Sequence, residues 1–332
     1  LDPLADPAAF RDALAEWFGK HGRDYPWRRT SDPYAVLVSE VMLQQTQIAT
    51  VLGRNYYGRF LDRFPDPETL ATADDADLLK AWEGLGYYRR VRMLRETARS
   101  VVAAGVFPEA LDDLQKLPGV GRYTANAVRA FAFDLPAAVV DGNVARVLSR
   151  LVEYRETVDS PAGLKHLWTF ADLLADPERP KIYNSALMEI GQTCCRPGVP
   201  DCLACPIARF CKTREPEALP AKTPKAKTTQ IDSHVLWMRD SEGRVLLHQE
   251  QGKRRQGLWK LPEREADEVS GLTEIATHRY GITRFQVTLH VYLAGPEIPL
   301  REHESWQAPE AIAALAMPSP YRRAVEALLE DA

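Results

Sequence analysis

Helical periodicity dominates the chain up to about residue 193. Apolar residues recur with the spacing of a helix face over 33–51 and 78–104, and short stretches rich in proline and glycine separate such segments. The first segment also begins as a helix should. Ser31 or Asp32 can cap its N-terminus, and Pro33 suits the first helical position, where a missing N–H costs nothing. The pattern therefore predicts a mainly helical domain.

The pattern changes after Cys211. Residues 216–230 have few large apolar side chains, three prolines and three lysines, which is typical of a linker. Beyond the linker, period-two runs predict strands, and a final periodic segment predicts a closing helix. These elements are strands at 234–239, 244–249 and 286–293, a hairpin turn at 241–243, and a helix at 321–330. We expect a helical domain at 1–215, a linker at 216–230 and an α+β domain at 231–332.

Composition agrees with two domains, because 332 residues with 45% hydrophobic content are too many for one ordinary compact domain. The chain has 42 basic and 46 acidic residues, a net charge of −4, which excludes a protein that is basic over its whole surface. Any contact with nucleic acid must therefore be local. No signal-peptide core or membrane-length apolar run is present, so we expect a cytoplasmic protein.

All the cysteines lie in one short stretch, which does not suit disulfides between distant segments. Four of them have the spacing Cys195-x6-Cys202-x2-Cys205-x5-Cys211. Four thiolates in a loop suit either tetrahedral zinc or a cubane iron–sulfur cluster, although zinc ribbons usually have two C-x2-C pairs and this segment has one. We interpret Cys194 as a buried small side chain and not as a ligand.

A glycine-rich turn, Leu117-Pro118-Gly119-Val120-Gly121, lies between helical runs at 111–116 and 123–133. Such a turn lets backbone N–H groups at the start of the second helix point outward, where a phosphate oxygen can bind. On its own, it could equally be an ordinary corner between two helices.

Two carboxyl groups can carry chemistry. Glu40 lies in an almost wholly apolar helical turn, where desolvation should raise its pKa so that it holds a proton at neutral pH. Asp141 precedes a helical run at 144–151 and alone would be read as a helix cap. Together they are an acid and an anion, the two groups needed to break an N-glycosidic bond through an oxocarbenium-like sugar.

These features resemble MutY-type adenine DNA glycosylases of the endonuclease III superfamily. The matching motifs run in the same order through the helical region: Pro26-Trp27-Arg28, Ser39 to Gln47 (SEVMLQQTQ), Gly84-Leu85-Gly86-Tyr87-Tyr88, the glycine-rich turn, Asp141-Gly142-Asn143-Val144 and the cysteine loop. The resemblance implies a helix-hairpin-helix glycosylase fold. It also implies that Cys195, Cys202, Cys205 and Cys211 bind a [4Fe–4S] cluster.

The resemblance also implies roles for single residues. Glu40 would protonate adenine at N7 and Asp141 would stabilise the sugar cation, with Tyr123 and Asn143 assisting. Gln45, Leu85 and Tyr87 would enter the base stack, because no side chain reaches the glycosidic carbon in a stacked duplex. Arg23, Trp27 and Glu189 would line the adenine pocket. The full set expected to contact DNA or the flipped base in the helical domain is Arg23, Trp27, Arg28, Gln45, Thr46, Leu85, Tyr87, Gly119, Val120, Gly121 and Glu189.

In the C-terminal part, residues 256–262 (QGLWKLP) resemble the entry of a Nudix-like domain. The G-x5-E-x7-R-E-x2-E-E string of a Nudix pyrophosphatase does not follow, so we interpret this domain as a recognition module without catalysis. Ile282-Thr283-Arg284 stands where many relatives have Phe-Ser-His, which assigns the opposite-base contact to Thr283 and Arg284. Ala145 replaces a lysine of some relatives, so no adventitious Schiff-base trapping of DNA is expected.

The sequence thus predicts a monofunctional glycosylase, a monomer that removes adenine opposite 8-oxoguanine or guanine in double-stranded DNA. Three alternatives remain open. An endonuclease III-like lyase would need a lysine nucleophile where this chain has Tyr123, and a phenol cannot form a Schiff base. A thymine glycosylase for G·T mismatches is not excluded by the pocket residues. A DNA-binding module without activity would have no need of a carboxyl in an apolar turn.

Overall fold

The computed structural model describes residues 4–224, 227–295 and 297–330. The chain divides into two compact units, each assembled from two separate stretches of sequence. Unit 1 comprises Leu1–Gln44 and Ser100–Pro224, and unit 2 comprises Gln45–Arg99 and Lys225–Ala332. The helical region predicted from the sequence therefore contributes to both units.

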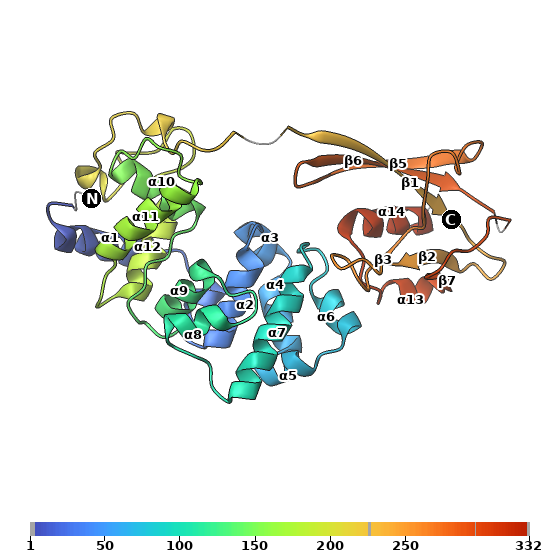
Figure 1. Cartoon of the computed structure of the whole chain (residues 1–332), viewed down its shortest axis with the longest axis horizontal. Coiled ribbons are helices and arrows are strands. Elements are labelled where there is room, and N and C mark those ends of the chain that lie inside the picture. Colours follow the sequence, from blue (N-terminus) through green and yellow to red (C-terminus); the bar gives the residue numbers. More distant parts are fainter. Residues whose placement is uncertain (1–3, 225–226, 296, 331–332) are drawn as a thin grey trace. The chain divides into compact units, whose positions relative to one another are not determined.

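Unit 1 is helical (Figure 1). Its helices are α1 (Pro7–His21), α2 (Pro33–Leu43), α8 (Leu111–Lys116), α9 (Arg122–Phe131), α10 (Gly142–Leu151), α11 (Pro161–Leu174) and α12 (Pro180–Thr193), with the short 3-10 turns η1 (Pro26–Arg28), η2 (Ala208–Phe210) and η3 (Pro216–Ala218). Three of the starts follow one rule: Asp6, Asp32 and Ser160 each accept a hydrogen bond from the first helical turn and are followed by proline.

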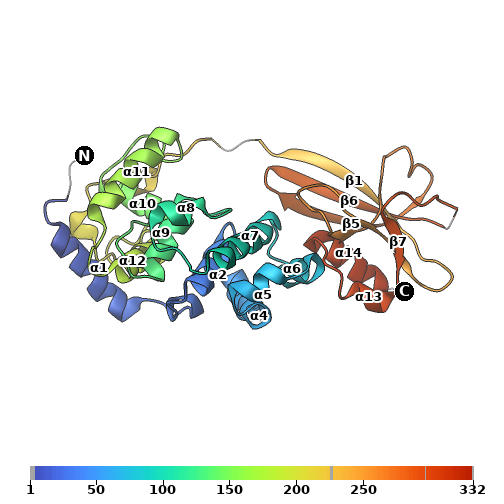
Figure 2. The ribbon, with the colours of Figure 1, turned by 60° about the horizontal axis from the view of Figure 1, so that its bottom comes forward.

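The core of unit 1 forms where α1 packs against α12 and α10 packs against both α11 and α12, as Figure 2 shows for this group of helices. Their inward faces supply fully buried side chains, including Phe10, Leu14, Val144, Leu148, Leu167, Phe170, Leu187 and Ile190. Because α10 and α12 both belong to this core, the residues at their ends are held on a rigid frame.

Two helical segments that were predicted to be continuous are interrupted in the structure. The helical segments expected at 33–51 and 78–104 are each broken by a loop. In the first, the chain leaves the helix after Leu43 and Gln45 has φ +57°; in the second, Gly84 and Gly86 have φ +97° and +67°. Left-handed residues cannot continue a right-handed helix, although apolar spacing persists across both breaks. The helices observed are α3 (Ile48–Gly53), α4 (Tyr56–Arg63), α5 (Pro67–Thr72), α6 (Asp75–Ala81) and α7 (Arg89–Ala104), the last of which ends in unit 1.

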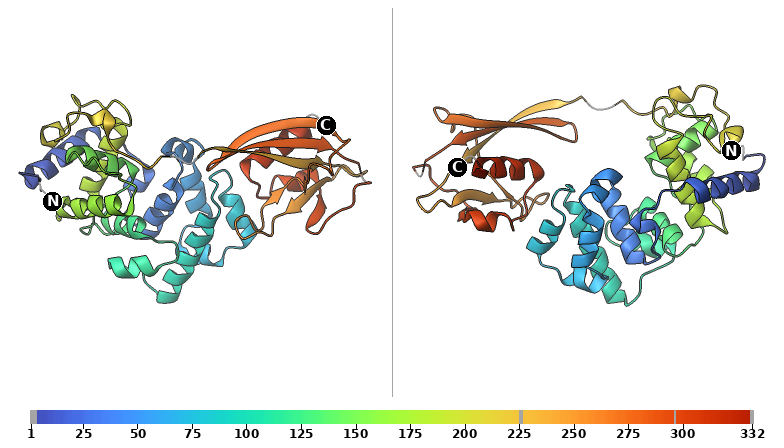
Figure 3. Two further views of the ribbon diagram at one scale, coloured as in Figure 1. Left: turned by 45° about the horizontal axis from the view of Figure 1, so that its top comes forward. Right: turned by 180° about the vertical axis from the view of Figure 1, so that it is seen from behind.

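The C-terminal part of unit 2 is α+β. Its strands form one sheet in the order β4-β1-β6-β5, with β1 and β6 parallel, and a second sheet in the order β3-β2-β7. The elements are β1 (Thr229–Trp237), β2 (Val245–Gln249), β3 (Trp259–Lys260), β4 (Glu263–Arg264), β5 (Thr273–Ile282), β6 (Phe285–Leu293), β7 (Glu304–Gln307), α13 (Pro309–Ile312) and α14 (Ser319–Glu330). Helix α14 packs against β5, beside the larger sheet in both views of Figure 3.

The predicted strands and closing helix are present, but β1 begins earlier than predicted, and β3, β4, β5, β7 and α13 were not predicted. Strand β1 starts at Thr229, so the end of the segment interpreted as a linker is extended and paired with β6. Strand β5 was not predicted, because it lies at the edge of its sheet and buries none of its residues fully, so its apolar alternation is weak. Among the described residues, no helix is long and apolar enough to cross a membrane.

Candidate active site

Helix α2 carries Glu40 into the interior. Asp32 caps the helix by accepting hydrogen bonds from the N–H groups of Tyr34 at 3.0 Å and Ala35 at 3.2 Å. Every residue from Tyr34 to Met42 is buried, so the helix is apolar on all sides and Glu40 is only 5% exposed. A carboxyl in such surroundings loses its hydration and becomes harder to ionise.

Glu40, Tyr123 and Asp141 interact electrostatically although they come from three places in the chain: the second half of α2, the first turn of α9 and the N-cap of α10. Burial raises the pKa of Glu40 to about 7, a hydrogen bond from the Tyr123 hydroxyl opposes the rise, and the negative charge of Asp141 adds to it. Burial and the two carboxylates together raise the pKa of Tyr123 well above its usual range, so the phenol remains a donor. At neutral pH Glu40 is therefore poised to give up or accept a proton.

Asp141 is both a helix cap and an oriented anion. One carboxylate oxygen accepts from the Val144 N–H at 2.7 Å, which caps α10, and the other accepts from the Asn143 side-chain amide at 3.0 Å. The helix cap expected from the sequence is therefore present, and the role of Asp141 toward a sugar cation stays a prediction. Hydrogen bonds to both oxygens hold the charge in one orientation.

Arg146 links this turn to the cysteine loop, and it was missed from the sequence. Its guanidinium donates to the Asn143 side-chain oxygen at 2.9 Å, to the Gly191 carbonyl at 2.6 Å and to the Cys195 carbonyl at 2.8 Å. The available signal was its position three residues after Asn143, on the same face of a helix. Arg146 thus ties the turn that carries Asp141 and Asn143 to α12 and to the segment that follows it.

A second cluster surrounds Glu189, which is fully buried on α12. Its carboxylate is paired with Arg28 at 2.8 Å and with Arg23 at 2.9 Å. The Arg28 guanidinium also lies 4.7 Å from the centre of the Tyr25 ring, which stacks on Trp27. Since η1 packs against α2, and α12 packs against α9 and α10, this cluster is built on the elements that carry Glu40, Tyr123 and Asp141.

The glycine-rich turn between α8 and α9 bends sharply at Gly119, as the sequence predicts, but the N–H of Val120 is used inside the turn and is not free for a phosphate. Gly119 has φ +76°, which explains the need for glycine there, and the Val120 N–H is used within the turn by the Leu117 carbonyl at 3.1 Å. Gly121 is the residue before α9, and no described side chain caps that helix start. The N–H groups of its first turn are thus the ones open to an anion.

The residues expected to open the duplex lie on two loops of unit 2. Gln45 is exposed in a left-handed conformation, and Tyr87, with φ +48°, is 48% exposed. Leu85 is instead buried, with 5% of its surface exposed. Arg90, also missed from the sequence, joins the loops by donating to the Leu85 carbonyl at 2.8 Å and the Thr46 hydroxyl at 3.3 Å.

Thr283 and Arg284 form the two-residue turn between β5 and β6, and both are exposed. Thr283 has φ +52° and donates its hydroxyl hydrogen to the Ile282 carbonyl at 2.7 Å. The Arg284 carbonyl accepts from the Thr229 N–H at 2.9 Å, which ties the turn to the neighbouring strand. Its guanidinium lies over the Phe285 ring.

The cysteine loop, residues 195–211, packs partly against the core of unit 1 through Cys195, Cys205 and Cys211, while Cys202 is exposed and Cys194 is buried. Buried Arg150 donates to the Cys195 sulfur at 3.3 Å and to the Arg196 and Gly198 carbonyls. No group of three or more His, Cys, Asp or Glu side chains in the described residues is arranged to hold a single metal ion.

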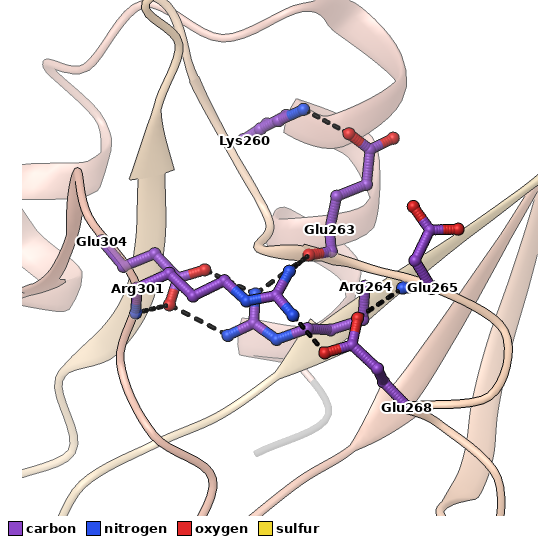
Figure 4. A network of polar contacts seen from close by, with 7 residues as sticks. All are labelled: Lys260, Glu263, Arg264, Glu265, Glu268, Arg301 and Glu304. Carbon is purple, nitrogen blue, oxygen red and sulfur yellow. Dashed lines mark hydrogen bonds and ion pairs between the residues drawn. The ribbon is translucent and has the colours of Figure 1, made fainter.

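Three acidic residues of the C-terminal part, Glu263, Glu268 and Glu304, are paired with basic ones (Figure 4). Glu304 accepts two hydrogen bonds from Arg264, at 2.6 and 3.0 Å, and the two side chains are 1% and 3% exposed. Glu263 is paired with Lys260 and Glu268 with Arg301. These carboxylates serve to join β4, β7 and the turn between β4 and β5.

Comparison with known proteins agrees with this geometry. Residues 38–169 match the family described as HhH-GPD superfamily base excision DNA repair protein. The chain is 44% identical over 223 residues to the adenine DNA glycosylase of Homo sapiens, a match that covers 64% of this chain and 40% of the human protein. It is 34% identical over 328 residues to the adenine DNA glycosylase of Arabidopsis thaliana, covering 84% of this chain and 52% of the plant protein.

The helical region is thus similar in sequence to the MutY-type adenine DNA glycosylases. Solved structures agree on the superfamily: a thermostable thymine-DNA glycosylase aligns with a TM-score of 0.56 and 29% identity, covering 62% of this chain and 95% of that one. An endonuclease III–DNA complex aligns with a TM-score of 0.51 and 25% identity, covering 63% and 92%. The endonuclease III and MutY group is known for an iron–sulfur cluster. The chain spans about half the length of the curated MutY-type relatives named above.

Proposed function

We propose that this protein is a monofunctional DNA glycosylase that removes adenine paired with 8-oxoguanine or guanine in double-stranded DNA. The observation that carries the proposal is the trio of Glu40, Tyr123 and Asp141, in which a buried carboxyl has a pKa of about 7 beside a second, oriented carboxylate. A general acid is most effective when its pKa lies near the working pH. That the base removed is adenine is inferred from the similarity to adenine DNA glycosylases.

The reaction follows from these groups. Protonated Glu40 gives its proton to the flipped adenine, at N7 by family resemblance, and the electrons of the bond between C1′ and N9 leave with the base. Positive charge then develops on the sugar, and the Asp141 carboxylate stabilises it electrostatically. Water adds to C1′ and loses a proton to a carboxylate, which leaves free adenine and an abasic site. Asn143 keeps Asp141 in position for this step.

We assign the adenine pocket to Arg23, Trp27, Arg28 and Glu189. One oxygen of Glu189 has no hydrogen-bond partner in the described structure, although Arg23 pairs with it ionically at 2.9 Å. A buried carboxylate oxygen without a hydrogen bond is a natural acceptor for the exocyclic amino group of adenine. Trp27, stacked on Tyr25, supplies an aromatic face of the kind on which bases stack.

DNA contacts are assigned to three places. The α9 start, with Gly119, Val120 and Gly121 before it, would bind a phosphate without reading sequence. Gln45, Thr46 and Tyr87 would hold the duplex open, and Leu85 would join them only by leaving its buried position. Thr283 and Arg284 would probe the base opposite adenine, in a Nudix-like module of residues 231–332 that follows a glycosylase domain of residues 1–215 and a linker. We expect a DNA-associated monomer.

The cysteine loop fits a [4Fe–4S] cluster, held by Cys195, Cys202, Cys205 and Cys211. Four soft thiolates suit iron, and the buried Arg150 guanidinium donates to the sulfur of Cys195, as is common around cluster ligands. When bound, the cluster would hold the loop in one conformation. The carbonyl of Cys195 in turn holds Arg146, and with it Asn143.

Release assays on duplexes containing A, T or uracil opposite G or 8-oxoguanine test the proposal. We expect free adenine from the A·8-oxoguanine and A·G duplexes, and strand breaks only after alkali, because Tyr123 cannot form the Schiff base that a lyase needs. Release of thymine but no adenine would favour a thymine glycosylase, the activity named for one of the similar solved structures. Strand breaks without alkali would favour a lyase, and no release of any base would favour a binding module.

A further inference from the structure

The loop of residues 82–88, which joins α6 to α7, is braced by the helices beside it. Trp82 is fully buried and donates its indole N–H to the Gly86 carbonyl at 3.1 Å. Arg90 donates to the Leu85 and Gly86 carbonyls. Gly84 approaches Tyr56 so closely that a Cβ there would lie 1.9 Å from the phenol oxygen. The tip of this loop therefore has little freedom on its helical side.

The same loop contacts the C-terminal stretch Ile312–Arg322 within unit 2. Glu83 pairs with Arg322 at 2.7 Å, and the side chains are only 13% and 12% exposed. The Arg322 guanidinium also donates to the Ile312 carbonyl at 3.0 Å and to the Leu315 carbonyl. Tyr88 donates its hydroxyl hydrogen to the carbonyl of fully buried Met317 at 3.1 Å.

These contacts lie on both sides of the residues expected to enter the base stack. Glu83 precedes Leu85 by two positions, and Tyr88 directly follows Tyr87. Tyr87 is 48% exposed at φ +48°, a conformation that β-carbon sterics disfavour and that surrounding contacts must maintain. Opening a duplex costs unstacking energy. Side chains that enter the base stack would therefore be less effective on a loop that moves when they press against the bases.

We propose that the stretch Ile312–Arg322 holds the loop of residues 82–88 in place for duplex opening. Arg322, Glu83 and Tyr88 are then positioning residues, and their contacts form a brace for this loop. The C-terminal part then contributes to base flipping through a contact separate from the Thr283–Arg284 turn. Deletion or loosening of the brace lowers the rate of opening and leaves the chemistry at Glu40 intact. This inference rests on the proposed function, because it assigns duplex opening to this loop.

The test compares Arg322→Met, which keeps the apolar stem and removes the charge, with native protein. Opening is followed by stopped-flow fluorescence of 2-aminopurine placed at the target adenine, and chemistry by single-turnover release of adenine. Each is measured opposite 8-oxoguanine and opposite an abasic-site analogue, where no base pair opposes flipping. We expect opening and release opposite 8-oxoguanine to be about tenfold slower, which corresponds to about 1.4 kcal/mol of activation free energy. Opposite the abasic analogue we expect near-native rates.

Matched variants separate positioning from stability. Arg244→Met removes a half-exposed ion pair with Asp240 in the same C-terminal part and should leave opening at the native rate. Glu83→Gln should also slow opening, and the losses of the double variant should be less than additive, because the two single variants share the Glu83–Arg322 pair although Glu83 also pairs with Lys80 and Arg322 also donates to two carbonyls. Tyr88→Phe removes a single hydroxyl and serves where Arg322→Met unfolds; it should slow opening with the same dependence on the opposite base.

The brace is refuted by native opening rates for Arg322→Met and Tyr88→Phe, or by equal losses on both duplexes. A defect shared by Arg244→Met would likewise overturn it. Failure of the proposed function is distinguishable: native protein would then raise 2-aminopurine fluorescence but release no adenine, or would do neither. If fluorescence rises without release of adenine, the opening rates of the variants still test the brace. If neither signal is seen, the proposed function and the brace are both contradicted.

Discussion

The pKa values of two buried carboxyl groups of this protein are shifted in opposite directions. Glu40 lies in unit 1 and is 5% exposed, and burial raises its pKa to about 7. The Glu304 side chain lies in the C-terminal part of unit 2 and is 1% exposed. Burial also works to raise the pKa of Glu304, but hydrogen bonds from Arg264 and from the Arg301 backbone N–H, together with the Arg264 charge, outweigh it and lower the pKa (Figure 4).

The difference lies in the neighbours and not in the depth of burial. Glu304 meets a bidentate guanidinium, which keeps it ionised and makes it an anchor between strands. Glu40 meets a phenol and a second carboxylate, which leave it ready to carry a proton. One residue type thus serves the fold in one region and the chemistry in another.

The comparison predicts that Glu40→Gln removes activity and that the same change at Glu304 does not. Glutamine keeps the shape of Glu40 but cannot donate an acidic proton, so adenine release should fall by about 10³-fold, while DNA binding stays near native. Single-turnover release and a binding titration measure the two effects. A Glu40→Gln variant with more than about a tenth of native activity would contradict the acid role.

The converse prediction concerns folding. Glu304→Gln leaves the Arg264 guanidinium buried without its counterion, so the free energy of unfolding should drop by about 4 kcal/mol. Denaturant unfolding at neutral pH measures it. The control is Glu268→Gln, which removes the more exposed ion pair with Arg301 and should cost less than about 1 kcal/mol. Equal losses for the two variants would show that the buried pair is no anchor.

Glu40 should also cost stability when it is ionised. Its folded pKa of about 7 lies above the ordinary value of 4.5, so its favourable contribution is complete below pH 4.5 and is lost as the pH rises through 7. Glutamine avoids this loss. At pH 8.5, Glu40→Gln should therefore be more stable than native protein by about 3 kcal/mol, with the gap closing toward pH 5. Thermal unfolding across this range would show no such gap if Glu40 titrates normally.

The smallest effect is expected at Tyr123. Its hydrogen bond favours the ionised form of Glu40, so Tyr123→Phe should raise the pKa of Glu40 further and move the pH dependence of release to higher pH. Loss of one hydrogen bond should slow release by about threefold at neutral pH. A pH profile of the variant that moves to lower pH instead would show that the phenol acts on Asp141 and not on Glu40.

Local chemistry made part of the site predictable. The apolar run around Glu40 determined its burial, and Asp32 and Pro33 determined where its helix begins. The C-terminal strands at 244–249 and 286–293 followed from period-two patterns. The breaks at Gln45 and at Gly84 could not be read from periodicity, because helices on both sides of each break bury apolar faces.

The parts that were missed depend on contacts between distant segments. Arg146 and Arg90 resemble ordinary surface residues of amphipathic helices until the fold places distant groups beside them, the Gly191 and Cys195 carbonyls at Arg146 and the Thr46 hydroxyl at Arg90. The Glu83–Arg322 pair joins residues that are 239 positions apart. No local pattern encodes such pairs, since either partner alone would be acceptable in solvent.

The pH dependence of single-turnover adenine release from an A·8-oxoguanine duplex tests the central claim most directly. If Glu40 is the proton donor, the rate is highest where Glu40 is protonated and falls as the pH rises through about 7. The decrease in rate with pH should follow the titration curve of a single group. The rate of Glu40→Gln should show no such decrease. A native rate that stays flat between pH 6 and 9, or falls in the same way for Glu40→Gln, would contradict the account.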